Sequence, residues 1–471
     1  MVFDSLSFLL FFLVVLAAYQ LPLPWAWRKG LLLAFSYAFY AAWNPPFVVL
    51  IWISTLVDWF AARGIARTST PGLRRGLLAL SLATNLGLLA FFKYGDFLLE
   101  NFVALVRAFG GDFQPAAPGI LLPIGISFYT FQTLSYTIDV WRGERPSKSW
   151  LDFALYVTFF PQLIAGPIVR SGEFLPQCSE PRRSTGEDLG WGFALMLVGL
   201  FFKVVLADLM LAPLADDVFA NAKRAGFVAA WSGAFAFSGQ IYFDFAGYST
   251  IALGAARCLG FALPTNFRSP YAALGFSDFW RRWHISLSSW LRDYLYIPLG
   301  GNRRHALRVS TNLLFTMLLG GLWHGASWLF VVWGGLHGAY LMVERGLTAL
   351  FPGWTDPRGV LGRVALTLGT YLLVCFAWVF FRAPDLSSAL ALAGAMLVGG
   401  RGSLALDFVQ LELALLAVAL MLIGNQIMRE RTLPAAAARL PWWVNSFVLA
   451  AMMVLVVLGS GENRVFLYFQ F

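Results

Sequence analysis

The sequence predicts an all-α, polytopic integral membrane protein. Hydrophobic residues make up 59% of its 471 residues and charged residues only 13%, whereas charged residues approach about a quarter of a soluble protein. The mean hydropathy is +0.69. Apolar runs long enough to cross about 30 Å of hydrocarbon recur from end to end, and such runs predict helices, whose backbone groups are hydrogen-bonded within the segment.

We expect about 11 or 12 helices to cross the membrane, with re-entrant or interfacial helices between them. The candidate spans are residues 5 to 22, 29 to 43, 46 to 64, 76 to 93, 119 to 141, 150 to 169, 187 to 207, 228 to 246, 247 to 263, 307 to 323, 325 to 344, 361 to 381, 409 to 427 and 443 to 459. Not all of them cross, because Pro123, Pro161, Pro167 and the Gly-rich region 320 to 338 break helices. Broken backbone survives at membrane depth only where protein or a cavity surrounds it.

Composition also predicts how the chain is divided. No sizeable stretch is polar enough for a separate soluble domain, so we expect a single transmembrane domain over residues 1 to 471. Residues 120 to 340 are dense in Gly, Pro, Trp, Tyr and intramembrane polar groups, which favours them as the functional core. Residues 1 to 115 and 345 to 471 carry plainer apolar spans and are predicted to be peripheral.

Basic residues predict the orientation of the chain. They cluster at 28 to 29, 63 to 75, 142 to 148, 303 to 308 and 429 to 439, and the positive-inside rule places those loops in the cytoplasm. The N-terminus and the tail from Glu462 to Phe471 then lie outside. The net charge of +9 is scattered over these short loops, which indicates membrane lipids as partners and no nucleic acid.

Several familiar site types do not occur in the sequence. Cys178, Cys258 and Cys375 show neither a disulfide framework nor metal spacing, so we expect no metal site. The sequence has no nucleotide-binding Gly-Lys-Ser/Thr loop, no His-Glu-x-x-His helix and no Gly-x-Ser-x-Gly elbow. ATP hydrolysis and zinc-dependent hydrolysis are therefore disfavoured.

Two of the four histidines lie in aromatic, apolar sequence, where an imidazole is costly unless its nitrogens find partners. His324, in Gly-Leu-Trp-His-Gly, is a candidate general base for a hydroxyl or thiol, worth about 10²- to 10⁴-fold in rate. Its alternative is a core histidine bonded to a backbone carbonyl. His284, in Arg-Arg-Trp-His, either binds an incoming donor nearer the cytoplasm or stacks on neighbouring Trp. His337 is interpreted as structural or supporting, and His305 as solvated.

Two intramembrane carboxylates are candidate supporting residues. Asp208 is expected to pair with Lys203 or an arginine and organise a cavity, and Asp244 is expected to orient an imidazole. For both, a buried ion pair or a helix-packing hydrogen bond is the alternative.

The segment from Ser277 to Arg303 is too polar to cross the bilayer directly, and its Trp and Tyr residues are typical of an interfacial or re-entrant helix. Arg281 and Arg282 are predicted to reach lipid headgroups or to grip a ligand phosphate, and Trp283 to lie beside them at this interface.

These motifs together resemble a known family. The matching segments are LPIGISFYTFQTLSYTIDVWRG (122 to 143), FFPQLIAGPIVR (159 to 170), FFKVVLAD (201 to 208), IYFDFAGYS (241 to 249), SDFWRRWHISLSSWLRDYLYIPLGGNR (277 to 303) and GGLWHGASWLFVVWG (320 to 334). They resemble the membrane-bound O-acyltransferase family, and within it the alginate O-acetyltransferase branch, which is shared with cellulose and peptidoglycan acetylation systems and related to the teichoic acid D-alanylation protein.

The resemblance implies a central tunnel with His324 as the principal catalytic residue, His284 as the second family histidine and Asp208 as a further site residue. It also implies transfer of an acetyl group from cytoplasmic acetyl-CoA, with no bound cofactor, across a bacterial inner membrane. The acceptor would be an exported polysaccharide such as alginate or cellulose, or peptidoglycan. Implied partners are a periplasmic SGNH-type acetyltransferase and polysaccharide export machinery.

Two details qualify the resemblance. Related sequences read Phe-Asp-Phe-Ser-Gly-Tyr-Ser-Asp where this chain has Ala246 and Thr250, so Asp244 stands without the second carboxylate. The tail FLYFQF also resembles this branch, and it is predicted to dock a periplasmic partner through Phe466, Tyr468 and Phe471.

Two other functions use the same features. A transporter or flippase would have the same discontinuous helices and intramembrane charges. A scaffold that only recruits a periplasmic enzyme would depend on the tail and not on His324.

Overall fold

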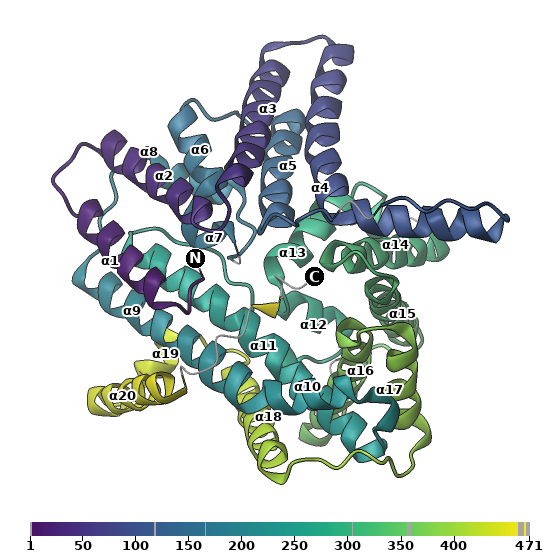
Figure 1. Cartoon of the computed structure of the whole chain (residues 1–471). Coiled ribbons are helices and arrows are strands. Elements are labelled where there is room, and N and C mark those ends of the chain that lie inside the picture. The colour runs from purple at the N-terminus through teal and green to yellow at the C-terminus, as the bar shows by residue number, and fades with distance from the viewer. Residues whose placement is uncertain are drawn as a thin grey trace. The chain divides into compact units, whose positions relative to one another are not determined.

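Helices form all the regular structure of the described residues, and no strand occurs among them. The computed structural model (Figure 1) describes residues 2–116, 119–164, 166–303, 305–355, 359–459 and 466–467. The predicted all-α class is therefore confirmed.

The chain divides into two compact units. Unit 1 comprises residues 1–195 and 252–264, and unit 2 comprises residues 196–251 and 265–471. The helices α9 (Gly186–Leu200) and α11 (Phe227–Cys258) each have residues in both units. The predicted organisation as one domain stays a prediction.

Unit 1 is built on a group of three helices, α3 to α5, that contact one another (Figure 1). Its remaining elements before α9 are short helices and connecting turns. The elements are α1 (Leu6–Tyr19), α2 (Trp25–Ala41), η1 (Pro45–Phe47), α3 (Val48–Arg67), α4 (Pro71–Ala108), α5 (Ile126–Arg142), α6 (Trp150–Thr158), α7 (Phe160–Leu163) and α8 (Ser171–Ser179).

A buried carboxylate joins these three helices. Asp58 of α3 is completely buried and accepts hydrogen bonds from Ser81 and Asn85 of α4 and from Thr137 of α5. Buried polar groups are tolerated when they are hydrogen-bonded in this way. Asp58 is therefore a packing group of unit 1.

Unit 2 holds the remaining elements. They are η2 (Phe201–Leu211, a π-helix), α10 (Ala212–Ala220), η3 (Ala222–Arg224), η4 (Pro270–Ala272), α12 (Phe276–Arg282), α13 (Ile285–Leu291), η5 (Arg292–Tyr296, also π), η6 (Gly301–Arg303), α14 (Ala306–His324), α15 (Trp328–Leu350), α16 (Val360–Arg382), α17 (Leu386–Val398), α18 (Phe408–Met428), α19 (Leu433–Ala437) and α20 (Trp442–Gly459).

Glycines allow α14 and α15 to cross at close range. A Cβ placed on Gly334 would lie 3.2 Å from the Cα of Gly321 and 3.0 Å from the carbonyl carbon of Met317. A Cβ on Gly321 would in turn lie 3.1 Å from the Cα of Gly334. Small residues at helix crossings permit this backbone approach, and the crossing fixes the end of α14 where His324 lies.

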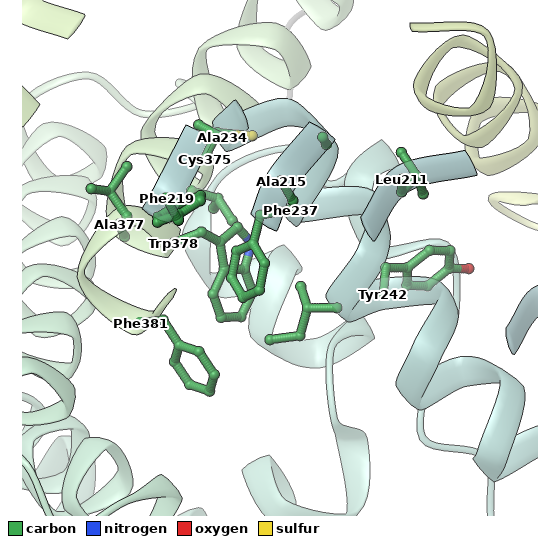
Figure 2. Packing of buried hydrophobic residues seen from close by; sticks show 14 of the residues in the cluster. Leu211, Ala215, Phe219, Ala234, Phe237, Tyr242, Cys375, Ala377, Trp378 and Phe381 are labelled. Atoms are coloured by element: carbon green, nitrogen blue, oxygen red, sulfur yellow. The ribbon is translucent and has the colours of Figure 1, made fainter. Parts of the chain in front are cut away.

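The core of unit 2 is aromatic. Figure 2 shows Trp378 and Phe381 of α16 beside Phe237 of α11. The Trp378 ring lies 5.2 Å from Phe381 and 6.3 Å from Phe237, both edge to face, which is a favoured arrangement for aromatic pairs. This core extends to the rings around the two histidines.

Seven described helices are long and apolar enough to cross a membrane: 45–67, 71–108, 186–220, 306–324, 360–382, 408–428 and 442–459. These seven helices confirm a multi-pass membrane protein, and the expected total of 11 or 12 crossings stays a prediction. The prediction of separate spans at 228 to 246 and 247 to 263 is wrong, because α11 runs unbroken from Phe227 to Cys258. A glycine such as Gly247 costs an otherwise buried helix only about 1 kcal/mol and does not end it.

The predicted break at Pro161 is confirmed. Phe159 leaves the helical conformation, with φ −51° and ψ 110°, and separates α6 from α7. Pro161 lies in the first turn of α7, where its missing N–H is not needed.

Candidate active site

His324 is the last residue of α14, which ends because Gly325 adopts an extended conformation with φ −165°. Its side chain is 3% exposed. The rings of Trp323, Trp333 and Phe381 lie 5.0, 5.1 and 5.3 Å from the imidazole, measured between centroids. These contacts place the His324 imidazole in an aromatic enclosure at the end of α14.

His284 occupies the residue before α13 in a left-handed backbone conformation, with φ 42° and ψ 54°. It is fully buried. Two backbone hydrogen bonds hold this turn, from Ile285 N–H to the Asn266 carbonyl at 2.9 Å and from Arg268 N–H to the Arg282 carbonyl at 3.0 Å. A non-glycine residue held in this region is strained, and such strain is concentrated at functional sites.

The structure brings the two histidines together. Their ring centroids are 6.3 Å apart, and the Phe245 ring lies 4.7 Å from His284. Both imidazoles belong to one buried group of aromatic rings in unit 2. His284 and His324, expected at different depths along a path, are therefore neighbours at a single site.

A buried ion triad lies in the same unit. Lys203 of η2 lies 3.0 Å from Asp208 and 2.7 Å from Asp244 of α11, measured from Nζ to carboxylate oxygens. All three side chains are less than a tenth exposed. Opposite charges at these distances offset the cost of burial only when the geometry is good. The predicted pairing of Asp208 with Lys203 is thus observed.

Asp244 uses both carboxylate oxygens for groups other than an imidazole. One oxygen faces Lys203, and the other accepts a hydrogen bond of 2.9 Å from the backbone N–H of Leu467. Gly247, one turn further along α11, lies against the backbone of Lys203, because a Cβ added to Gly247 would be 3.1 Å from the Lys203 backbone nitrogen. The expectation that Asp244 orients an imidazole stays a prediction.

A pocket of about 300 Å³ lies between α12, α13, α14 and α15. Its polar lining comes from Ser277, Arg281, Ser288, Ser289 and Arg292, and Trp280 and Met317 contribute apolar walls. The pocket adjoins α13, which begins directly after His284, and α14, which ends at His324. Among the described residues, no group of three or more His, Cys, Asp or Glu side chains is placed to hold a metal ion.

Comparison with known proteins is decisive about the kind of chemistry. The sequence model of the membrane-bound O-acyltransferase family matches residues 142–371, a range that includes both His284 and His324. A protein of Azotobacter vinelandii named as a probable alginate O-acetylase is 41% identical over 90% of this chain and 83% of its own length. The chain belongs to the membrane-bound O-acyltransferase family.

Other relatives carry related names. The peptidoglycan O-acetyltransferase of Helicobacter pylori is 40% identical over 82% of this chain and 76% of its own length. The teichoic acid D-alanyltransferase of Streptococcus thermophilus is 28% identical over 53% of this chain and 63% of its own length. The protein is therefore a multi-pass membrane O-acyltransferase of the alginate O-acetylase-like branch.

The tail of this acyltransferase differs from the prediction. Phe466 is fully buried, and its ring stacks on Tyr248 at 4.1 Å and lies 6.0 Å from Phe245. Phe466 is therefore not exposed for docking a partner, because its apolar side chain fills the space beside α11. Tyr468 and Phe471 lie outside the described residues.

Arg282 and Trp283 have protein partners in the structure, and their predicted role in donor binding stays a prediction. The Arg282 guanidinium is held by Asp278 at 3.0 Å and Glu430 at 2.9 Å, and it donates to the Arg429 carbonyl. Trp283 is fully buried and stacked on Phe279 at 5.6 Å. Only Arg281 of the three lines the pocket, with 71% of its side chain exposed.

Some site residues were not predicted from the sequence. Asn266 clamps the backbone after His284 and accepts a hydrogen bond of 2.6 Å from Ser286, while Phe245 packs on the His284 ring. Phe245 is adjacent to the predicted Asp244, which was the available signal. Nothing in the local sequence distinguishes Asn266 from a loop asparagine.

Proposed function

We propose that this acyltransferase takes an acetyl group from cytoplasmic acetyl-CoA and passes it through the membrane for O-acetylation of an exported polysaccharide, with His324 as catalytic residue. The observation that carries the proposal is the pairing of two buried imidazoles, His284 and His324, 6.3 Å apart in an O-acyltransferase. The names of the relatives support the acetyl group and an acceptor such as alginate or peptidoglycan. Cellulose is a further acceptor that the sequence resemblance implies.

The chemistry requires one proton to move. His324 accepts the proton of the attacking hydroxyl as its oxygen bonds to the thioester carbonyl carbon, the C–S bond breaks, and the CoA thiolate takes up that proton as it leaves. In a second version His324 attacks the carbonyl itself, releases the thiol and then passes the acetyl group to the hydroxyl. Mass spectrometry after incubation with donor alone separates the two, because only the second leaves an acetyl adduct on His324.

The pocket beside α13 suits the arm of the donor. Its volume of about 300 Å³ fits a slender thioester-bearing chain and not a whole nucleotide. Arg281 and Arg292 line it with side chains that are 71% and 62% exposed, where they can meet phosphates from solvent. Ser288 and Ser289 supply hydroxyls for the amide groups of the arm.

Location and partners follow from the same proposal. The basic loops support a donor side in the cytoplasm of a bacterial cell, and we propose the inner membrane as the location, since an exported polymer could be modified there from cytoplasmic acetyl-CoA. A periplasmic SGNH-type acetyltransferase and export machinery then receive the group, with Tyr468 and Phe471 of the outward tail as docking residues.

An experiment in proteoliposomes distinguishes transfer of the acetyl group from transport of the whole donor. We load acetyl-CoA labelled in both the acetyl group and the nucleotide on the cytoplasmic side. The proposal predicts that the acetyl label appears on an acceptor at the opposite face while the nucleotide label stays behind as free CoA. A transporter or flippase moves both labels together, which would contradict the proposal. A scaffold moves neither.

A further inference from the structure

A cluster of three rings near His324 carries nitrogens without a hydrogen-bond partner among the described residues. The rings belong to Trp280 of α12 and to Trp333 and His337 of α15. Each ring contacts the other two, with centroid distances of 5.8 Å for Trp280–Trp333, 5.1 Å for Trp280–His337 and 4.9 Å for Trp333–His337. We call this group the indole–imidazole cluster.

Burial makes these unmet nitrogens informative. Trp333 and His337 are completely buried, and the indole nitrogen of Trp280 is buried as well. A buried donor without an acceptor is costly, and each such group in a folded protein calls for an explanation. Several in one closed cluster indicate a binding place for a molecule that supplies the acceptor.

The balance of donors and acceptors defines that molecule. An indole only donates, and a neutral imidazole donates once and accepts once, so three donors in the cluster stand against one acceptor. A carbonyl oxygen has two lone pairs and brings no donor of its own. A water molecule would bring two further donors to a cluster that has one acceptor to offer them.

The contacts of the cluster link the pocket to the catalytic histidine. Trp280 lines the 300 Å³ pocket together with Met317. Met317 also lies close to Gly338, the residue next to His337: a Cβ added to Gly338 would be 3.4 Å from the Met317 Cβ. At the other side Trp333 lies 5.1 Å from His324. The cluster therefore connects Trp280, which lines the pocket, with Trp333, whose ring contacts His324.

We propose that Trp280, Trp333 and His337 bind the carbonyl oxygen of the acyl group on the donor thioester. This inference rests on the proposed function, since it takes a thioester donor to occupy the pocket. Hydrogen bonds to that oxygen draw electron density from the carbonyl carbon and favour its attack at His324. The alternative is that the N–H groups point at neighbouring ring faces, which is a weaker interaction and provides no preference for a carbonyl.

Two pairs of unreactive ligands test the proposal on the full-length protein. The first pair is the ketone analogue of acetyl-CoA, in which CH₂ replaces sulfur, and S-ethyl-CoA, which lacks the carbonyl. The second pair is the matching ketone and thioether of N-acetylcysteamine, which lack the nucleotide. We expect the wild type to bind each ketone about tenfold more tightly than its partner, the worth of roughly one hydrogen bond.

Variants then assign the preference to the cluster. Replacing Trp333 with benzothienylalanine changes only N–H to sulfur, so the fold is kept, and we expect the ketone preference to fall to about twofold or less. Trp280→Phe and His337→Phe are expected to act alike. Trp231→Phe is the matched control, because the Trp231 indole donates to the Met396 carbonyl at 3.2 Å, and its ketone preference should stay unchanged.

The outcomes separate this inference from the proposed function. If the protein prefers the cysteamine ketone to its thioether but binds neither CoA ligand, acetyl-CoA is not the donor, while the proposed role of the indole–imidazole cluster is supported. Equal affinity for ketone and thioether in the wild type, or a preference that survives at benzothienylalanine 333, overturns the inference whatever the donor.

Discussion

The imidazoles of His284 and His324 lie 6.3 Å apart although 40 residues of chain separate them. One ring is positioned by a strained turn held by Asn266, and the other by the end of a helix that is fixed at a glycine crossing. The site is therefore built from backbone features as much as from side chains. The predictions below test those features separately.

The strained turn predicts an unusual order of stability at residue 284. Ala keeps the cost of the left-handed conformation, roughly 1 kcal/mol, while Gly does not. His284→Gly should therefore melt at a higher temperature than His284→Ala, with both variants impaired in acyl transfer. Thermal unfolding in detergent measures this order, and a more stable His284→Ala would show that the backbone is not strained there.

The helix crossing predicts a difference between neighbouring glycines. In Gly334→Ala the new methyl meets the Met317 backbone, which cannot move aside, so we expect a loss of about 1–3 kcal/mol. In Gly335→Ala the nearest atom is a Leu318 methyl at 3.5 Å, an ordinary contact, so stability should be nearly unchanged. Equal melting temperatures for the two variants would contradict the close crossing of α14 and α15.

The ion triad predicts that removing the lysine destabilises the protein more than neutralising one of the aspartates. Lys203→Met leaves Asp208 and Asp244 buried without their cation and should cost about 3–5 kcal/mol or prevent folding. Asp244→Asn leaves Lys203 paired with Asp208 and keeps an acceptor for the Leu467 N–H, so the loss should be smaller. Expression level and chemical unfolding compare the two, and the reverse order would exclude the triad.

Substitutions of the adjacent residues Arg281 and Arg282 are predicted to affect different properties, donor binding in one case and stability in the other. Arg281→Ala removes an exposed cation from the pocket and should raise the donor KM about two- to fivefold with little change in melting temperature. Arg282→Ala breaks a buried bond to Asp278 and a partly exposed one to Glu430 and should lower stability by roughly 2 kcal/mol. If Arg281→Ala leaves the donor KM unchanged, the pocket is not the donor site.

Composition and local pattern were sufficient for the helical membrane class, because hydropathy depends on short-range sequence. They did not predict the orientation of Arg282, since that depends on Arg429 and Glu430, more than 140 residues away. They did not predict the burial of Trp283 either, since that depends on Trp378 of α16. The burial of Phe466 was not predicted for the same reason. Its burial depends on Tyr248 and on the bond between Leu467 and Asp244, 223 residues apart.

The left-handed turn at His284 could not be predicted either. The sequence Trp-His-Ile contains no glycine or asparagine that would indicate a positive φ, and the turn exists because Asn266 and Arg268 hold the backbone on both sides of it. The continuity of helix α11 was not predicted from the sequence either. Within unit 2 Tyr248 and Ser249 are buried, so the helix continues.

If His324 carries out the transfer, its replacement should stop acyl transfer without unfolding the protein. Wild type, His324→Ala and the control Trp231→Phe are reconstituted at equal amounts, each with its melting temperature recorded, and acyl transfer from labelled acetyl-CoA is followed over a single turnover. We predict that His324→Ala loses about 10²- to 10⁴-fold in rate with its fold intact, and that Trp231→Phe, whose indole donates to the Met396 carbonyl, keeps nearly the wild-type rate. Transfer by a folded His324→Ala at the wild-type rate would contradict the account.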